Sequence, residues 1–273
     1  MPRQLATPDL NIFESALFRT TSTCIHTKDY LLIVDPNWLP SEVAEIAAFT
    51  GLHGEGKELF LLFTHSDYDH IIGYGAFPGF TTIASQRFVD NPDAAAQLAQ
   101  TVAWDDEYYV KRKYALSYPA IDRAVAGDGT AMRIGGDDYL FYQAPGHNYD
   151  GLVTFNRSRG ILIVGDYLSN IEFPYVYHSF ADYRATLGKL ETLIGSGEVR
   201  TLVTGHGDHT TNPPEMRHRI TESRAYLDEL EAAVRAGVDY DFGKIERRYD
   251  FPGVMRKFHG KNVELMRREL PRD

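Results

Sequence analysis

Short apolar runs of strand length alternate along this chain with segments whose apolar residues recur at helical spacing. The runs are rich in leucine and β-branched residues and end in turn residues, which is typical of buried β-strands. They cover residues 30–35, 58–64, 80–84, 139–144, 152–156, 160–166 and 200–205, and the helical segments cover 40–49, 92–116, 179–194, 213–236 and 254–270. Alternation of this kind predicts an α/β fold in which helices cover β-sheets.

The segment over 213–236 carries the clearest helix signals. Asn212 is a suitable N-cap, Pro213 falls in the first turn, and Gly237 follows the last turn. No proline- or serine-rich linker and no low-complexity tract divides the chain. We therefore expect one domain over residues 1–273, with C-terminal helices at about 213–270.

Four potential metal ligands fall within six residues directly after the apolar run at 58–64. They are His65, Asp67, Asp69 and His70. The carboxyl ends of strands are where α/β sheets place their functional sites, and mixed imidazole and carboxylate ligands suit zinc, iron or manganese. In an extended loop, His65 and Asp67 would point to one side, while the other two would turn toward a second centre.

Three further candidates follow later strands, and each comes directly after a glycine. They are His147, Asp166 and His206. Glycine permits sharp turns and a close approach of the backbone. Polar ligands at the ends of four strands predict one site, built at one edge of the sheets.

Composition narrows the class of protein. The chain has 273 residues, of which 43% are hydrophobic, so it is long enough to bury a core without disulfides. Cys24 is the only cysteine, which excludes an intramolecular disulfide and a cysteine-based metal site. The net charge of −10 disfavours nucleic acid as a partner. The sequence has neither a long apolar run nor a signal-peptide pattern, so we expect a cytoplasmic protein that makes no use of the membrane.

The order of these residues resembles the metallo-β-lactamase superfamily of hydrolases. The family run His-x-His-x-Asp-His, with single His, Asp and His ligands downstream, corresponds here to His65-Ser66-Asp67-Tyr68-Asp69-His70, then His147, Asp166 and His206. The apolar strand that ends in Asp35 resembles the first family motif, in which this Asp is structural rather than a ligand. The resemblance runs from about residue 20 to about residue 210. It implies a four-layer αβ/βα metallo-β-lactamase-type sandwich with a dinuclear metal site at one edge.

The resemblance also implies a set of ligands. His65, Asp67 and His147 would hold a first metal ion, Asp69, His70 and His206 would hold a second one, and Asp166 would bridge them. Two divalent ions are expected, with zinc first and iron or manganese as alternatives. A metal-bound hydroxide would be the nucleophile, and Asp69 would be the catalytic residue that accepts its proton.

Asp67 departs from the family pattern, which usually has His at this position. The ligand set then contains three carboxylates, which lowers the charge of the core, raises the pKa of bound water and favours harder metals such as iron or manganese. The flavodiiron-type oxygen reductases of the superfamily also have a carboxylate here, although it is Glu. Asn148 is a second departure, since many relatives have Thr after this His, and its amide suits a hydrogen bond to a neighbouring ligand.

Aromatic residues in two segments are candidates for the walls of a substrate pocket or for the core. They are Trp104, Tyr108, Tyr109, Tyr114 and Tyr118 in the first segment, and Phe173, Tyr175 and Tyr177 in the second. Tyr149 or Asp150, which follow His147 closely, are also candidates for the pocket. A helical insertion at about 86–120 would cover the site, and the helix at 254–270 would pack on the sandwich or form a homodimer contact.

These features predict a metal-dependent hydrolase that acts on a small-molecule ester, lactone, thioester or phosphoester. The acidic charge and the extra carboxylate favour a neutral substrate such as a lactone or ester. Asp67 keeps open a di-iron oxidoreductase on the same fold, and the two departures together keep open a non-catalytic metal- or ligand-binding protein. Fold alone does not identify the substrate.

Overall fold

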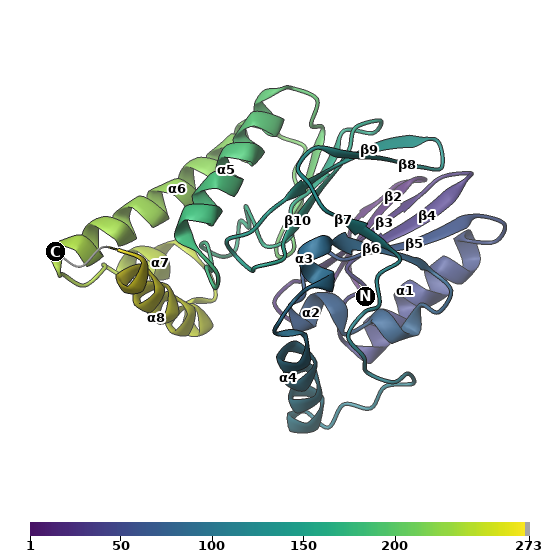
Figure 1. The fold of residues 1–273 in the computed structure, drawn as a ribbon, viewed down its shortest axis with the longest axis horizontal. Coiled ribbons are helices and arrows are strands. Elements are labelled where there is room, and N and C mark those ends of the chain that lie inside the picture. The colour runs from purple at the N-terminus through teal and green to yellow at the C-terminus, as the bar shows by residue number, and fades with distance from the viewer. Residues whose placement is uncertain (271–273) are drawn as a thin grey trace.

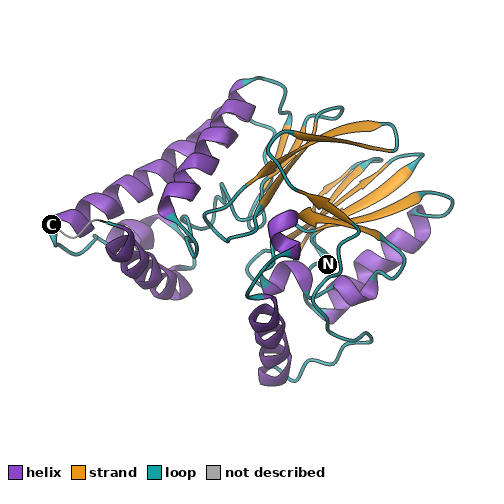
Figure 2. Cartoon of the chain, in the orientation of Figure 1, coloured by secondary structure: helices purple, strands orange, loops and turns teal. Residues whose placement is uncertain are grey.

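Two β-sheets face each other at the centre of the molecule, and helices cover the outer face of each (Figures 1 and 2). The computed structural model describes residues 1–270. The first sheet has seven strands in the order β1 (Arg3–Ala6), β2 (Leu10–Glu14), β3 (Thr21–His26), β4 (Tyr30–Val34), β5 (Glu58–Leu62), β6 (Thr81–Ser85) and β7 (Arg123–Val125). Strands β1 to β4 pair antiparallel, and β4 to β7 pair parallel.

The second sheet has five strands, and its order is β12 (Thr201–Val203), β11 (Ile161–Ile163), β10 (Leu152–Asn156), β9 (Asp137–Gln143) and β8 (Thr130–Ile134). The helical elements before β7 are α1 (Pro40–His53), α2 (Tyr68–Ile71), the short 3₁₀ helix η1 (Tyr74–Ala76), α3 (Gln86–Val89) and α4 (Ala94–Glu107). Those after β11 are α5 (Phe180–Gly195), α6 (Pro213–Ala236), α7 (Gly243–Arg248) and α8 (Pro252–Glu269). Among residues 1–270 no helix combines the length and the apolar character that crossing a membrane requires.

Strand β4 explains how the layers are held together. Its five residues are all buried, and successive side chains point to opposite faces of the sheet. Leu31 and Ile33 pack outward against Ile46 of α1, while Leu32 packs inward against residues of the second sheet such as Phe141. Burial on both faces is typical of a strand inside a covered sheet and accounts for its continuous apolar run.

The second sheet has its own apolar layer on the outside. Leu162 and Phe155 of this sheet pack in one cluster with Leu187 of α5, Leu227 of α6 and Met266 of α8. The molecule is therefore layered as helix, sheet, sheet and helix (Figure 2). This arrangement confirms the predicted four-layer αβ/βα sandwich.

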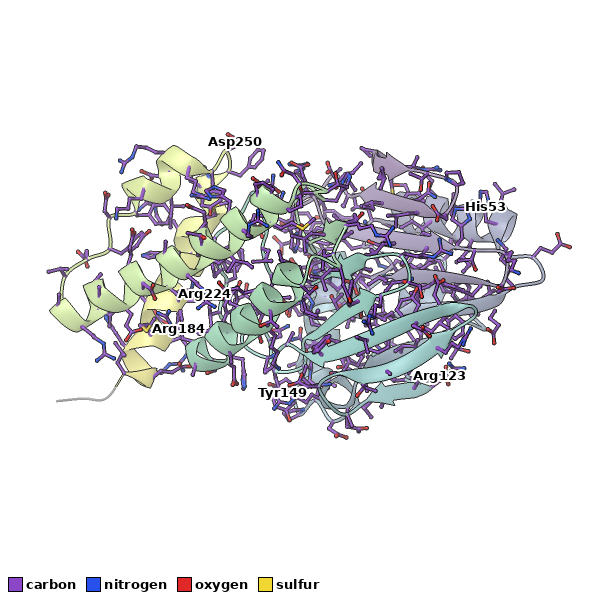
Figure 3. The ribbon with its side chains drawn as sticks, turned by 90° about the horizontal axis from the view of Figure 1, so that it is seen from above. His53, Arg123, Tyr149, Arg184, Arg224 and Asp250 are labelled. Atoms are coloured by element: carbon purple, nitrogen blue, oxygen red, sulfur yellow. The ribbon has the colours of Figure 1, made fainter. Side chains whose placement is uncertain are left out.

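Ion pairs join α5 to α6 outside this layer. Arg184 of α5 pairs with Glu231 of α6 at 3.1 Å, and Arg224 of α6 pairs with Glu191 of α5 at 2.8 Å. Figure 3 shows the two arginines on the helical side of the molecule, away from the sheets. Such exposed pairs each contribute about 0.2–1 kcal/mol, so the packing of the apolar faces dominates.

Strands β1 to β3, β7 and β8 were not predicted, and in β3 the reason is that buried polar residues interrupt the apolar pattern. Thr21, Ser22 and Thr23 of β3 are all buried. The Thr21 hydroxyl donates a hydrogen bond to the Thr204 carbonyl oxygen at 2.6 Å, which satisfies it away from water. A strand whose polar groups are paired by distant segments has no signature in its own sequence.

The helix predicted over 92–116 is shorter than expected, since α4 ends at Glu107. Tyr109 adopts a left-handed backbone conformation with φ of 55°, which turns the chain. The Arg112 guanidinium then donates to both carboxylate oxygens of Asp105, at 2.6 and 2.7 Å, and fixes the segment that follows. The expected helical cover over 86–120 is therefore helical only in α3 and α4.

Helix α8 is tied to α6 and to the segment before α5 by buried polar groups. The Asn262 amide donates to the Pro174 carbonyl oxygen at 2.7 Å and to the Tyr226 hydroxyl at 3.0 Å, and its oxygen accepts from the Val176 N–H at 3.0 Å. The Tyr226 hydroxyl also lies 3.0 Å from Nδ1 of His259. These contacts fix the C-terminal helix against the sandwich.

The pH dependence of stability tests this anchor. Burial, with the nearby Arg256 cation, lowers the pKa of His259 to about 4. Its ordinary value is 6.5, so the unfolded chain binds a proton that the folded chain does not bind between these pH values. The stabilisation is therefore complete above pH 6.5 and is lost as the pH falls toward 4.

Between pH 6.5 and 4.5 we expect His259→Gln to lose about 1 kcal/mol less unfolding free energy than the wild type, because solvent screening reduces the full effect of the pKa shift. Chemical unfolding of both proteins at the two pH values measures the difference. An equal loss of unfolding free energy in both proteins would show that His259 is not buried in its neutral form.

Candidate metal centre

The candidate centre begins with a carboxylate at the end of β4. Asp35 adopts a left-handed conformation with φ of 53°, and its Oδ1 accepts a hydrogen bond from the Thr64 N–H at 2.8 Å. Its Oδ2 accepts from the Thr64 hydroxyl at 2.6 Å and lies 2.9 Å from Nδ1 of His70. Asp35 is therefore a positioning residue for the loop after β5, as the sequence predicts.

Thr64 extends this influence to a second imidazole. Because its hydroxyl donates to Asp35, its oxygen is left to accept a hydrogen bond from Nδ1 of His65, at 2.9 Å. One carboxylate thus fixes the orientation of two histidine rings. In both, the contact at Nδ1 leaves Nε2 to face the centre.

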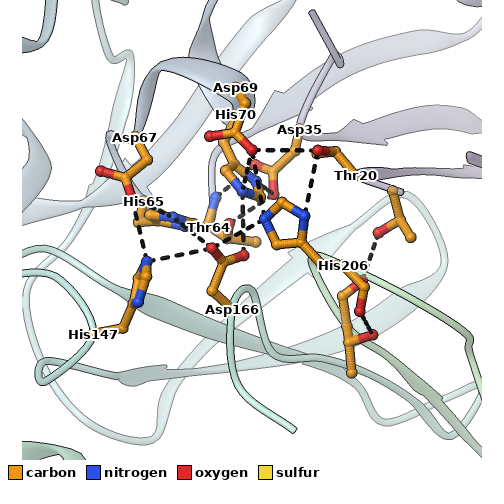
Figure 4. Close-up of polar contacts among 12 residues, drawn as sticks. Thr20, Asp35, Thr64, His65, Asp67, Asp69, His70, His147, Asp166 and His206 are labelled. Atoms are coloured by element: carbon orange, nitrogen blue, oxygen red, sulfur yellow. Dashed lines mark hydrogen bonds and ion pairs between the residues drawn. The ribbon is translucent and has the colours of Figure 1, made fainter. Parts of the chain in front are cut away.

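The other two histidines are oriented by backbone carbonyl groups. Nδ1 of His147 lies 2.7 Å from the Tyr175 carbonyl oxygen, and Nδ1 of His206 lies 2.9 Å from the Phe18 carbonyl oxygen. All four rings therefore direct Nε2 toward the carboxylate of Asp166 (Figure 4). Four imidazoles with this common orientation are suited to bind a cation.

Asp166 lies among the four Nε2 atoms (Figure 4). Its Oδ2 is 3.2 Å from Nε2 of His206 and 3.3 Å from Nε2 of His147. Its Oδ1 is 3.2 Å from Nε2 of His70, while Nε2 of His65 is 3.6 Å from Oδ2. This central position is the one expected for a residue shared by two metal sites.

The seven predicted ligands come together in two adjacent groups. Within each group, one nitrogen or oxygen atom per residue lies within 4.8 Å of the others. The first group is His65, Asp67, His147 and Asp166, and the second is Asp69, His70 and His206. This grouping is the one implied by the family resemblance, with Asp166 placed in the first group.

Two of the predicted glycines are required by this geometry. A Cβ atom at position 205 would lie 2.1 Å from Oδ1 of Asp166. Gly146 has a φ of 131°, and a Cβ atom there would lie 2.4 Å from the Tyr183 N atom. Any larger residue would displace the ligand next to it or the start of α5.

Unpaired polar atoms test whether a metal ion fits. Nε2 of His65, Nε2 of His70 and Oδ1 of Asp166 are buried and have no hydrogen-bond partner among the described residues. A buried polar atom without a partner costs about 1–3 kcal/mol. Because all three atoms face the same point and belong to good ligands for divalent metals, the residues present fit such an ion.

The electrostatics of the cluster point the same way. Burial alone would lower the pKa of His147, but hydrogen bonds and charge from Asp166 and Asp67 raise it to about 10. Burial raises the pKa of Asp166, but the charges of the surrounding imidazoles outweigh it and hold the pKa well below the ordinary value. The cluster thus favours positive charge at its centre, supplied either by protons or by metal ions.

The two departures from the family pattern are in contact with each other. The Asn148 amide donates a hydrogen bond to Oδ1 of Asp67 at 2.7 Å. The other carboxylate oxygen, Oδ2, lies 3.2 Å from Nε2 of His147. Asn148 therefore occupies one oxygen of Asp67 and leaves the other one directed at the first group.

Glu172 is a residue near the centre that the sequence did not indicate. It lines a small cavity with His147 and Asp166. Burial, with the charges of Asp166 and Asp69, raises the pKa of its carboxyl group to about 7, although the imidazole of His206 opposes this shift. Its only sequence signal is that it follows Asp166 by six residues.

A cavity of about 480 Å³ opens beside the first group of ligands. Both Tyr149 and Asp150 line it, as does Tyr177 from the second aromatic segment. Tyr108 and Tyr109 of the first segment are instead exposed, and the Trp104 ring packs 4.8 Å from that of Trp38. Residues of α4 and α8 also line it.

Comparison with known proteins agrees with this geometry. The sequence model described as the metallo-beta-lactamase superfamily matches residues 18–206. No curated protein matches the chain significantly. The matched residues contain all seven predicted ligands.

Solved structures of low sequence identity share the fold. A metallo-beta-lactamase family protein from Thermus thermophilus is 20% identical, with a TM-score of 0.64 over 85% of this chain and 84% of its own. A metallo-beta-lactamase from Pontibacter korlensis is 15% identical, with a TM-score of 0.58 over 82% and 98%. A stereoselective inverting sec-alkylsulfatase from Pseudomonas sp. is 13% identical, with a TM-score of 0.67 over 85% of this chain and 42% of its own. Since the family model matches more than half of its length, the chain belongs to the metallo-β-lactamase superfamily.

Proposed function

We propose that this protein is a metal-dependent hydrolase that acts on a small-molecule ester, lactone, thioester or phosphoester. The observation that supports this most is the convergence of four Nε2 atoms and three carboxylates beside a cavity of about 480 Å³. A cavity of this size accepts a small molecule. Most members of the superfamily are metal-dependent hydrolases, whereas the fold itself serves several reactions.

The residues that would hold two divalent ions are those of the two groups. The first ion would be bound by His65, Asp67 and His147. The second ion would be bound by Asp69, His70 and His206, and Asp166 would bind both ions. When bound, such ions would lower the pKa of a water molecule and stabilise negative charge on the reacting group. Zinc is the ion proposed first, with iron or manganese as alternatives.

Asp69 is the residue proposed to accept a proton. The Thr20 hydroxyl donates to its Oδ2 at 3.3 Å, and the same oxygen lies 3.5 Å from Nε2 of His206. Within residues 1–270, no hydrogen bond involves the other oxygen, Oδ1. That oxygen is therefore free to take a proton from a water molecule held in the centre.

We also propose that the substrate is a small molecule rather than nucleic acid, because the net charge is −10. We likewise propose a cytoplasmic location and a homodimer contact through residues 254–270.

A di-iron oxidoreductase is the second candidate function. Asp67 favours it, because a third carboxylate in the ligand set suits iron better than a third imidazole in the first group would.

Hydrolysis by the purified protein tests the first proposal. We expect activity toward at least one class in a panel of esters, lactones, thioesters and phosphoesters. Chelation should abolish it and added zinc or manganese should restore it. Asp69→Asn should lower kcat by about 10²–10⁴-fold, whereas Asp106→Asn, an exposed acid of α4, should leave it unchanged. Oxygen consumption by an iron-loaded protein that hydrolyses none of the panel would favour the second candidate instead.

Metal selection tests the role of Asp67. Replacing it by His should raise the ratio of zinc to iron in protein grown with both metals, because imidazole is softer than carboxylate. Asp93→Asn is the control, since Asp93 lines the cavity but belongs to neither ligand group. The ratio is measured by elemental analysis. An unchanged ratio of zinc to iron in Asp67→His would show that Asp67 does not determine which metal is bound.

Metal affinity tests the positioning role of Asp35. Asp35→Asn keeps the size of the side chain but removes the charge that orients His65 and His70, so zinc should bind about 10–100-fold more weakly. Competition with a chromophoric chelator measures this affinity. Thr64→Val keeps the volume and removes the hydroxyl contacts to Asp35 and His65, but it leaves Asp35 on His70, so it should have a smaller effect. Wild-type affinity in a folded Asp35→Asn protein would contradict this role.

A further inference from the structure

We propose that Lys257 and Lys261 of α8 form an oxyanion-binding wall of the active-site cavity. The substrate would then carry a carboxylate-type group at a distance from the bond that is hydrolysed. This inference rests on the proposed hydrolase function and names its substrate class more closely. It also replaces the neutral substrate expected from the net charge, because the local charge of this wall is positive.

Both lysines line the cavity, and they are one helical turn apart on α8. Gln97 and Gln100 of α4 line it too, so the cavity lies between these two helices, which both extend beyond the sheets (Figure 1). The wall on the α4 side therefore carries two uncharged amides and the acid Asp93, whereas the wall on α8 carries two cations. A ligand with an anionic end would be oriented by this difference.

Aromatic rings hold the Lys261 amine over the cavity. Its Nζ lies 5.6 Å from the ring centroid of Tyr177 and 5.6 Å from that of Phe258, which is within the range of cation–π contacts. Both rings line the cavity. Because the Tyr177 ring is 5.0 Å from that of His147, the Lys261 amine lies within about 11 Å of the first ligand group. A small molecule can span this distance.

The two positive charges are not neutralised by the protein. Arg247, Arg248 and Arg256, on α7 and α8, each have an acidic partner. Lys257 and Lys261 have none among residues 1–270, and both are exposed. Like charges four residues apart destabilise a helix slightly. An anion bound between them would remove this repulsion.

The acidic residues that line the cavity do not neutralise the positive charges of the two lysines. Asp67 belongs to the first ligand group, and Asp150 accepts hydrogen bonds from the Asn91 amide at 3.2 Å and from the Ser66 N–H at 3.4 Å. Asp93 is exposed at the start of α4, which is the opposite wall. Each acid is thus engaged elsewhere or lies across the cavity from α8.

The wall is also held in place by buried hydrogen bonds. Asn262, one residue after Lys261, anchors α8 through the carbonyl oxygen of Pro174 and the N–H of Val176. Helix α8 begins at Pro252, well beyond the family match, which ends at residue 206. The helix therefore lies outside the part of the chain that the family model describes, and its side chains would help to select among the substrates that the fold can serve.

Two esters with acyl chains of equal length test the proposal on the metal-loaded protein. They are 4-nitrophenyl pentanoate, which is neutral, and mono-4-nitrophenyl glutarate, which carries a terminal carboxylate. We expect kcat/KM to be about tenfold higher for the glutarate ester. In K257Q/K261Q this preference, measured as the ratio of the two kcat/KM values, should disappear. R267Q/R268Q, which removes two exposed charges of α8 outside the cavity, should keep the preference.

A preference that persists in K257Q/K261Q, or that R267Q/R268Q loses equally, would overturn the proposal. If neither ester is hydrolysed, the result counts against the hydrolase function for this class of ester. Glutarate binding then tests the oxyanion-binding wall independently of hydrolysis. Calorimetry of the metal-loaded protein should give a Kd for glutarate about tenfold weaker in K257Q/K261Q than in the wild type and R267Q/R268Q. Equal Kd values in the three proteins, or no binding in any, would overturn the proposal.

Discussion

The hydrogen bonds of one buried carboxylate determine how the candidate centre is built. Asp35 binds the backbone and the hydroxyl of Thr64 and faces Nδ1 of His70. Through Thr64 it also fixes His65. Two of the four imidazoles thus depend on a residue that belongs to neither ligand group. A ligand whose second nitrogen is held in this way keeps one tautomer and one orientation, which is what a metal site requires.

The sandwich supplies the remaining ligands from its two sheets. Strands β4 and β5 of the first sheet deliver Asp35 and the loop with His65, whereas β9, β11 and β12 of the second deliver His147, Asp166 and His206. The apolar layer between the sheets therefore sets the distances within the centre. Close-packed interiors resist deformation, so small changes in this layer would be felt at the ligands. Helix α8 adds to this frame without belonging to it, since it contacts the segment whose Tyr175 carbonyl orients His147.

The sequence was most informative where chemistry requires a fixed spacing. The run from His65 to His70 and the glycines before His147, Asp166 and His206 identified the residues that the structure brings together. The polar strand β3 was missed because Thr21 is satisfied by Thr204, which is distant in sequence. Glu172 and the two lysines of α8 were missed as site residues for a related reason. Their position beside the centre follows from tertiary packing. The net charge is a sum over the whole chain, so it does not show a local cluster of positive charge.

The contact between Asp67 and Asn148 connects the two departures from the family pattern. A sequence shows each as an isolated change, whereas the structure shows that the amide of one holds an oxygen of the other. All seven side chains act as ligands in the proposed centre. The most direct test is the number of metal ions per chain, measured by elemental analysis after zinc titration of the metal-free protein and removal of free ions. We expect about two ions per chain. A protein that stays empty, or that binds as many ions after His70 and His206 are both replaced by Ala, would contradict the seven-ligand centre.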